Sequence, residues 1–331
     1  MAASAPERIT GHRNAALRLA GGACEARDDD PAATRRGPVS QTAAVPNTPG
    51  GAEALRETPT SAGALRYYDV GQGPVVLFLH GSGPGVTGWR NFRGVLPTFA
   101  EHFRCLILEF PGFGVTDDWG GHPMVTAQGT VVPFLDALDI ERAHIVGNSM
   151  GGGVGINTAI AAPERVDRLV TIGGIGTNVF SPGPSEGIRL LQEFTEDPTR
   201  QRLVDWLNSM VFDQALLTDE LIEERWALAT DPETLAAARR MYGKAAFSAM
   251  MAAMASSEAP LPWARMHKVA APTLLTWGRD DRVSPLDMAL IPMRTIPDAE
   301  LHVFPRCGHW AMIEAKAAFE SVVTGFLQRV A

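Results

Sequence analysis

The sequence predicts a mostly parallel α/β sheet with helices on both faces and a helical segment inserted between two of its strands. Three observations lead to this fold class: short runs of apolar residues recur along residues 75–304, helical patterns separate most of these runs, and the alternation stops between residues 177 and 268. Continuous short apolar runs are typical of strands buried on both faces. Strands that alternate with helices form an open parallel sheet.

The predicted elements follow one another in a regular order. A first strand is expected at 65–69, a turn at 71–74, and a fully buried strand at 75–79. Further strand-like runs lie at 105–108, 144–146, 169–172, 273–276 and 301–304. Helical patterns lie between most of them, including 92–100, 126–138 and 154–162. Because ligands bind at the carboxyl ends of strands in such sheets, the residues that follow the strands are candidates for the site.

Residues 1–63 differ in composition from the rest of the chain. They are rich in Ala, Pro, Thr, Gly and Arg, and they contain no Lys, Trp, Tyr or Phe. Such a segment cannot bury enough apolar surface to offset its ordering entropy, so we expect a disordered extension. A genuine tail and a wrongly chosen start codon would give the same composition. The segment has no apolar core of a secretory signal.

The remaining chain divides into a core and an insertion. Residues 64–176 and 269–331 are expected to form the sheet with its helices, and residues 177–268 a helical lid. Apolar residues recur in this insertion at helical spacing, for example at Leu203, Trp206, Leu207 and Met210. Helices with apolar faces need something to cover, which favours a lid over ordinary surface helices.

Composition narrows the classes of function. The 331 residues are 45% hydrophobic and 20% charged, with a formal net charge of −8. The acidic balance argues against nucleic acid and anionic membranes as partners, and no apolar run is long enough to span a membrane. Cys24, Cys105 and Cys307 lack CxxC spacing, which argues against a zinc ribbon or a disulfide framework. We therefore expect a cytoplasmic protein.

The stretch Gly147-Asn148-Ser149-Met150-Gly151 contains the GxSxG pattern of a nucleophile elbow. Apolar residues before it indicate the end of a strand, and the residues after it indicate a helix. A serine at such a turn is held above the sheet edge, and the glycines leave room where strand and helix cross. A glycine-rich strand–helix connection with an incidental serine would have the same sequence pattern. Whether Ser149 is a nucleophile therefore depends on whether the rest of the chain supplies its catalytic partners.

A serine nucleophile needs a general base and an acid that orients the base. His309 lies after the last strand-like run, in Cys307-Gly308-His309-Trp310, and is the best of the eight histidines. Asp280 and Asp281 both follow the strand at 273–276. We choose Asp281, because Asp280 can pair with neighbouring arginines. The order Ser149, Asp281, His309 is that of an α/β-hydrolase.

The nucleophile also needs donors for an oxyanion. One should be the backbone amide of Met150, directly after Ser149. The other should come from the loop at residues 80–85, which has the sequence HGSGPG. This loop is not a phosphate-binding loop, because neither GKS/T nor GxGxxG is present. No cluster of His, Asp and Glu has the spacing of metal ligands, so we expect no metal.

These residues resemble the meta-cleavage product hydrolases, α/β-hydrolases that cut carbon–carbon bonds, over nearly all of residues 65–331. The HGSGPG loop is the most specific signal, since many general esterases have a shorter HGxG there. The other matching stretches are GNSMGG at 147–152, WGRDDR at 277–282, CGHW at 307–310 and the lid pair Arg225-Trp226. Glu109 and Thr116 depart from the commoner Asp and Ser, and the N-terminal extension lies outside the resemblance.

The resemblance implies a 2-hydroxy-6-oxohexa-2,4-dienoate as substrate, made by ring cleavage in aromatic or steroid catabolism. Ser149, Asp281 and His309 would be catalytic, with the backbone amides of Ser82 and Met150 as the oxyanion hole. Substrate-binding residues would be Gly83, Asn91, Asn148, Arg225 and Trp310. No cofactor is implied. We also expect a homo-oligomer, a dimer or larger.

Arg225 has support of its own from the sequence. The residues three and four positions away are apolar, so an ion pair within its helix is excluded. An arginine among apolar neighbours is expected to face a bound group, and its planar fork suits carboxylate oxygens.

Two alternative functions stay open: a carboxylesterase with the same triad, and a ligand receptor on a hydrolase scaffold. The substituent at C6 stays open. Residues 178–194 resemble actinobacterial members of the family that act on bulky steroid- or biphenyl-derived dienoates, and the resemblance implies a group of that kind.

Overall fold

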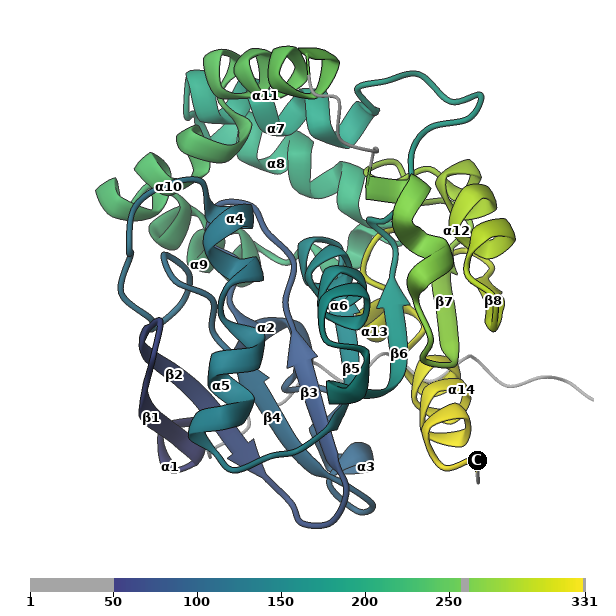
Figure 1. The fold of residues 1–331 in the computed structure, drawn as a ribbon. Coiled ribbons are helices and arrows are strands. Elements are labelled where there is room, and N and C mark those ends of the chain that lie inside the picture. Colours follow the sequence, from purple (N-terminus) through teal and green to yellow (C-terminus); the bar gives the residue numbers. More distant parts are fainter. Residues whose placement is uncertain (1–50, 257–261, 330–331) are drawn as a thin grey trace, which may run out of the picture. The chain divides into compact units, whose positions relative to one another are not determined.

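The structure is a computed structural model that describes residues 51–256 and 262–329. Within these residues, one sheet of eight strands has the order β1-β2-β4-β3-β5-β6-β7-β8 (Figure 1). The strands are β1 (Leu55–Thr60), β2 (Gly63–Val70), β3 (Val75–Leu79), β4 (Arg104–Leu108), β5 (Ala143–Asn148), β6 (Val166–Ile172), β7 (Thr273–Gly278) and β8 (Ala299–Phe304). The predicted fold class is confirmed.

The sheet is parallel from β4 to β8 and antiparallel at the β1 end. β2 pairs antiparallel with both β1 and β4, whereas β3, β5, β6, β7 and β8 run parallel to their neighbours. The carboxyl ends of the parallel strands therefore meet at one edge of the sheet. The loops that carry Ser149, Asp281 and His309 all leave this edge, after β5, β7 and β8.

Helices cover both faces of the sheet, with α4, α5 and α6 in front of it in Figure 1. The helices are α1 (Gly51–Ala54), α2 (Gly88–Phe92), α3 (Leu96–Phe99), α4 (Pro123–Gln128), α5 (Val131–Ala137), α6 (Met150–Ala161), α7 (Glu186–Glu196), α8 (Arg200–Met210), α9 (Asp219–Ala229), α10 (Pro232–Tyr242), α11 (Lys244–Ser256), α12 (Leu290–Thr295), α13 (Ala311–Glu314) and α14 (Lys316–Leu327). Short 3₁₀ helices lie at Pro163–Arg165, Gln214–Leu216, Pro262–Lys268 and Leu286–Ala289.

The continuous apolar run of β3 has a direct structural cause. Val76 and Phe78 pack into the core on the α2, α3 and α14 side, and Leu77 and Leu79 pack into the core on the α5 and α6 side. Side chains of a strand point alternately to the two faces of its sheet. Because helices cover both faces, every position of the strand must be apolar.

Between β6 and β7 the chain forms a helical insert, which holds α7 to α11. α7 packs against α8 and α10. The side chains of Thr199, Thr218 and Asp231 accept hydrogen bonds from the first backbone N–H groups of α8, α9 and α10. A cap of this kind contributes about 1 kcal/mol to a helix. These caps account for where the three helices begin.

Two of the helices expected from the sequence are broken. The pattern at 92–100 forms α2 and α3, because Pro97 has no N–H to continue a helix and instead lies in the first turn of α3. The pattern at 126–138 forms α4 and α5, since Pro133 cannot donate to the carbonyl of Gly129. The helix expected at 154–162 begins earlier, at Met150.

The predicted disordered extension at residues 1–63 was wrong for its last part. The chain from Gly51 is ordered as α1 and β1, and β1 pairs with β2 from Leu55↔Tyr68 to Thr60↔Gly63. An edge strand can be ordered by backbone hydrogen bonds to its neighbour, so β1 needs no hydrophobic periodicity of its own. Residues 1–50 of that prediction, with Cys24, lie outside the described residues.

No helix in the described ranges is long and apolar enough to cross a membrane. In the same ranges, no group of three or more His, Cys, Asp and Glu side chains could hold a metal ion. Cys105 and Cys307 are both buried and free.

Candidate active site

Ser149 occupies a strained turn between β5 and α6. Its backbone has φ 51° and ψ −112°, an uncommon conformation for a residue with a side chain. The turn is packed too tightly for side chains on either side: a Cβ at Gly147 would collide with the backbone of Gly151, and a Cβ at Gly151 with the carbonyl of Leu79. The GxSxG glycines are therefore required by contact with backbone, as the elbow interpretation predicts.

Asp281 and His309 form a buried pair. The Nδ1–H of His309 donates to Oδ2 of Asp281 at 2.7 Å, and both side chains are almost fully buried. The other carboxylate oxygen of Asp281 accepts from the backbone N–H groups of Val283 and Ser284, at 2.8 Å each. Because Nδ1 carries the proton that it donates to Asp281, the Nε2 atom of His309 is left as the acceptor that a general base needs.

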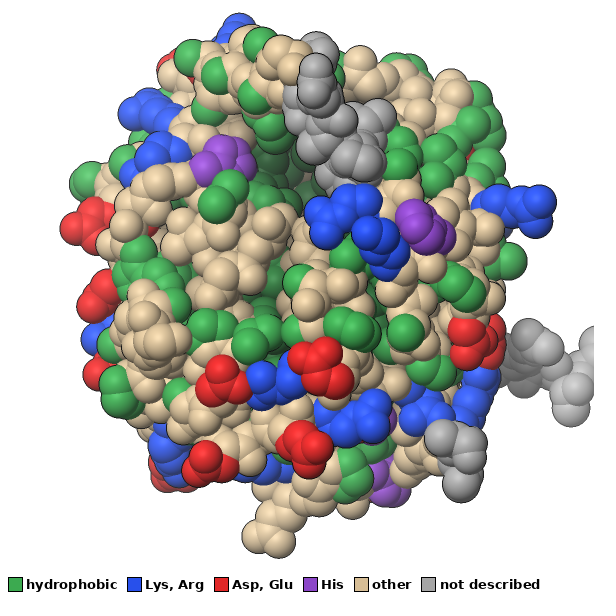
Figure 2. Space-filling model, viewed as in Figure 1, with side chains coloured by type: hydrophobic (Ala, Val, Ile, Leu, Met, Phe, Trp, Pro, Cys, Tyr) green, Lys and Arg blue, Asp and Glu red, His purple; other side chains and the backbone are tan. Residues whose placement is uncertain are grey.

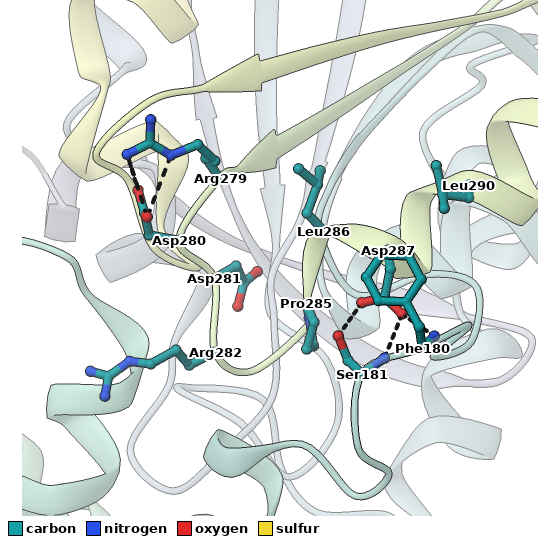
Figure 3. A pocket seen from close by; sticks show the side chains of 10 residues that line it. All are labelled: Phe180, Ser181, Arg279, Asp280, Asp281, Arg282, Pro285, Leu286, Asp287 and Leu290. Carbon is teal, nitrogen blue, oxygen red and sulfur yellow. Dashed lines mark hydrogen bonds and ion pairs between the residues drawn. The ribbon is translucent and has the colours of Figure 1, made fainter. Parts of the chain in front are cut away.

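The neighbouring carboxylate, Asp280, has a different partner. It pairs with the guanidinium of Arg279 at 3.2 Å, on a side of the loop away from Asp281 (Figure 3). The structure therefore places Asp281, and not Asp280, beside His309.

Two successive glycines after β6 bring the pair and the serine together. A Cβ at Gly173 would lie 3.2 Å from Oδ2 of Asp281 and 3.4 Å from Cε1 of His309. A Cβ at Gly174 would collide with the Ser149 backbone and lie 3.0 Å from its Cβ. Ser149 and the His309–Asp281 pair thus border adjacent positions of one loop. Sequence reasoning missed this loop, although the doubled glycine at a strand end is a signal that could have revealed it.

The loop after β3 is fixed by side chains on both of its sides. Nδ1–H of His80 donates to the carbonyl of Gly81 at 2.6 Å, and Nε2 accepts from the N–H of Phe110 at 3.0 Å. The second contact requires an unprotonated Nε2, so His80 is neutral; burial also lowers its pKa to about 4. Oδ1 of Asn91 accepts from the N–H of Gly81 at 3.0 Å.

Two backbone N–H groups near Ser149 are free to serve an oxyanion. Among the described residues, the N–H of Ser82 donates to no acceptor. Met150 is the first residue of α6, where backbone N–H groups lack a partner within the helix. The positive end of the α6 dipole also favours negative charge at this place. Nucleophile, base, orienting acid and free donors together can carry out acyl transfer.

Arg225 is buried beside this site without an ionic partner. It lies on α9, its side chain is 5% exposed, and its guanidinium carbon lies 5.3 Å from the ring centre of Trp310. Within the described residues, Nη1 of Arg225 has no hydrogen-bond partner. Burial lowers the pKa of Arg225 to about 10, as does the charge of Arg90, while Glu224 raises it. A buried cation with a free donor is suited to hold an anionic ligand.

The comparisons with known proteins agree with this geometry. The family model of the alpha/beta hydrolase fold matches residues 74–316. The chain is 41% identical over 261 residues to a 2-hydroxy-6-oxo-6-phenylhexa-2,4-dienoate hydrolase of Burkholderia cepacia, a match that covers 76% of this chain and 87% of the relative. The chain belongs to the meta-cleavage product hydrolases of the α/β-hydrolase family.

Other members of the family are similar to this chain to about the same degree. A 2-hydroxy-6-oxononadienedioate/2-hydroxy-6-oxononatrienedioate hydrolase of Comamonas testosteroni is 41% identical over 265 residues, covering 76% of this chain and 87% of the relative. Among solved structures, the meta-cleavage product hydrolase from Pseudomonas fluorescens IP01 has a TM-score of 0.74 and 33% identity, with 83% of this chain and 98% of that chain covered.

The remaining residues predicted to bind substrate lie around the same loops. The side-chain amide of Asn148 donates to the carbonyl of Ile172 at 3.0 Å, so its nitrogen is engaged with the backbone after β6. Gly83 lies against the indole of Trp206, at 2.8 Å from the place where a Cβ would be. Trp310 is buried beneath Arg225, one residue after His309.

Glu109 and Tyr242 were not assigned to the site from the sequence, although both hold loops that form it. Glu109 was noted only as a departure, but its buried carboxylate accepts from the N–H groups of Gly88 and Trp89 at 2.8 and 3.0 Å, and thereby holds the start of α2, which carries Asn91. Tyr242, at the end of α10, shares a hydrogen bond between its hydroxyl and that of Ser82. Nothing in the local sequence of α10 marks Tyr242, because its partner is 160 residues away.

Figure 2 shows hydrophobic side chains around a hollow between α4 and the helices of the insert. A separate cavity of about 580 Å³ lies behind the Asp281 loop (Figure 3). Its walls include Phe180, Pro285, Leu286 and Leu290, but neither Ser149 nor His309. We therefore assign the chemistry to the Ser149 side of the loop.

Proposed function

We propose that the protein hydrolyses the C5–C6 bond of a 2-hydroxy-6-oxohexa-2,4-dienoate, a ring-fission product of aromatic or steroid catabolism. Ser149 is the nucleophile, His309 the general base and Asp281 the acid that orients it. The backbone N–H groups of Ser82 and Met150 bind the oxyanion. The names of the relatives support this class of substrate, since they act on dienoates with a keto group at C6.

The steps follow from the chemistry of a vinylogous 1,5-diketone. A proton first moves from the 2-hydroxyl to C5, which gives the keto tautomer and makes C5 a leaving carbon. Ser149 Oγ then adds to the C6 carbonyl and its proton passes to His309. The C5–C6 bond breaks, its electron pair enters a dienolate that takes up a proton, and the acyl group stays on Ser149. Water activated by His309 hydrolyses this ester and releases a carboxylic acid.

The observation that carries the proposal is the buried guanidinium of Arg225. It lies over Trp310, the residue after His309, and its Nη1 has no hydrogen-bond partner among the described residues. A simple ester has no anionic end for it to hold, whereas the dienoate has a carboxylate and an adjacent oxygen at C2. The planar fork of arginine fits two such oxygens. Asn91, Asn148, Gly83 and Trp310 are proposed to border the same end.

A spectrophotometric assay tests the proposal. The purified protein is mixed with a yellow ring-fission dienoate and, separately, with p-nitrophenyl acetate. Loss of the visible absorbance of the dienoate is expected. Cleavage of the ester with a persistent dienoate would show a carboxylesterase, and inertness toward both would favour a ligand receptor.

Arg225→Ala tests the role of the cation. We expect a loss of about 100-fold or more in kcat/KM for the dienoate, since a hydrogen-bonded charge contact is removed, and a much smaller loss for p-nitrophenyl acetate. The matched control is Arg200→Ala, an exposed arginine of the same insert that pairs with Glu223. Equal losses on both substrates in Arg225→Ala would contradict the assigned role.

The oligomeric state stays a prediction. Exposed apolar side chains support a homo-oligomer. Phe180 and Leu290 are exposed and border the same cavity, and Val179 and Met293, which are close to them in sequence, are exposed as well. Sedimentation of the purified protein measures it directly.

A further inference from the structure

A second buried donor without a partner lies near the proposed oxyanion loop. Trp206, on α8, is 1% exposed, and within the described residues its Nε1–H makes no hydrogen bond. Buried indole N–H groups normally have an acceptor, and leaving one unpaired costs about 1–3 kcal/mol. An orphaned donor at such a place requires an explanation.

The indole lies against the loop that carries the proposed oxyanion donor. Cζ2 of Trp206 is 2.8 Å from the place where a Cβ on Gly83 would be, and Nε1 is only two bonds from Cζ2. Gly83 directly follows Ser82, whose N–H we assign to the oxyanion. The edge of the indole that borders the oxyanion loop is therefore formed by Cζ2 and Cη2 of the six-membered ring, and the N–H lies next to this edge.

Arg225 approaches the same loop from the next helix. Its backbone carbonyl is 3.1 Å from the place of a Cβ on Gly85, and its guanidinium lies over Trp310. Trp206 and Arg225 thus come from consecutive helices of the insert and contact positions two residues apart on one loop. Each also has a buried N–H that, within residues 51–256 and 262–329, makes no hydrogen bond.

Both groups are donors only, so they suit a ligand that is rich in acceptors. We propose that Trp206 Nε1–H donates a hydrogen bond to an oxygen of the bound substrate and makes Trp206 a specificity-determining residue. This inference rests on the proposed function, because the acceptor is an oxygen of the ring-fission product. That oxygen belongs either to the dienoate end, which every such substrate shares, or to a polar group on the C6 substituent.

The test uses Trp206→Phe, which removes the N–H and keeps an aromatic ring. Two dienoates are compared, one with a 6-phenyl group and one with a carboxylate on the C6 substituent, together with p-nitrophenyl acetate. We expect a loss of about tenfold or more in kcat/KM for at least one dienoate, and a change below about twofold for the ester. Trp119→Phe, at the β1–β2 edge, is the matched control and should change none of the three.

The pattern of loss locates the acceptor. A loss on both dienoates places it on the shared dienoate end, and a loss on the dicarboxylate alone places it on the C6 substituent. No loss on either dienoate would overturn the inference, as would an equal loss on the ester, which would show that the indole acts by packing against the loop. Failure of the unaltered protein to consume either dienoate would instead refute the proposed function.

Discussion

Asp280 and Asp281 are adjacent carboxylates with separate surroundings. Asp281 accepts three hydrogen bonds, from His309 and from two backbone N–H groups, while Asp280 is bound to the exposed guanidinium of Arg279. Their different contacts make them a natural pair for mutagenesis, because the same change can be made one residue apart.

Asp281→Asn should lower kcat by a factor on the order of 10³ to 10⁴. The amide oxygen stays with the N–H groups of Val283 and Ser284, so the NH₂ group faces Nδ1 and the imidazole loses the tautomer in which Nε2 is the base. Asp280→Asn is the control and should leave kcat within about twofold. Measurement of kcat for the dienoate decides, and comparable losses in both variants would contradict the assignment of the acid.

At the scale of elements, helix α10 ties the insert to the loop after β3. Tyr242 at its end bonds the hydroxyl of Ser82, and Arg240 donates to the carbonyl of Gly121 at 2.9 Å and pairs with Asp118. The position of the loop, and therefore of the Ser82 N–H, is thus linked to the packing of the insert.

Tyr242→Phe should reduce kcat by about three- to tenfold for the dienoate and for p-nitrophenyl acetate alike. The lost hydrogen bond loosens the loop that carries the Ser82 N–H, the oxyanion donor that both reactions use. An equal loss on both substrates distinguishes this variant from Trp206→Phe. Arg240→Ala, which removes the contacts of α10 with Gly121 and Asp118 but leaves Ser82 bonded, serves as the comparison. A loss confined to the dienoate would show that Tyr242 contacts the substrate instead.

The elements also show where sequence patterns are insufficient. Apolar runs located every parallel strand of the sheet. In β3 the cause is burial on both faces, whereas β8 is an edge strand whose residues are mostly half-buried. The breaks at Gly129–Pro133 and around Pro97 were missed, since the apolar spacing continues through them although the backbone cannot. β1 was missed because its order comes from its partner strand.

At the scale of the whole molecule, the pH dependence of stability is linked to Glu109. Burial raises the pKa of this carboxyl from 4.5 to about 7, offset in part by the N–H groups of Gly88 and Trp89. The folded chain therefore binds more protons here than the unfolded chain between about pH 4.5 and 7. Its stability contribution is largest below pH 4.5 and falls as the pH rises to 7.

Glu109→Gln should remove this dependence. The free energy of unfolding of the variant minus that of the unaltered protein should increase between pH 5 and 8, by on the order of 3 kcal/mol at most. His80, whose pKa burial lowers from 6.5 to about 4, acts in the opposite sense below about pH 6.5. Because its Nε2 lies 3.8 Å from Oε2 of Glu109, the increase between pH 6.5 and 8 is the part that belongs to Glu109 alone. Urea denaturation of both proteins at several pH values measures the difference between their free energies of unfolding. A difference that stays constant with pH would contradict the raised pKa of Glu109.

Much of the candidate site could be predicted because its residues follow strands that end at one edge of a sheet. The elbow, the histidine loop and the HGSGPG loop could each be located from their own local sequence. Tyr242 and Trp206 could not, since their significance depends on contacts between residues far apart in the chain. The Gly173–Gly174 loop has a local signal, the doubled glycine at a strand end, that the sequence analysis did not use. Glu109 was noticed only as an unusual residue, and its role needed the position of α2.

The insert contributes Trp206, Arg225 and Tyr242, while the groups proposed for bond breaking all come from loops at the edge of the sheet. These three residues of the insert are therefore encoded in one contiguous part of the gene, between the segments that encode Ser149 and the Asp281–His309 pair. Recombination at two points, one after β6 and one before β7, would exchange these three residues without altering the triad. A lineage of such enzymes can in this way acquire new growth substrates while its acyl-transfer chemistry is inherited unchanged.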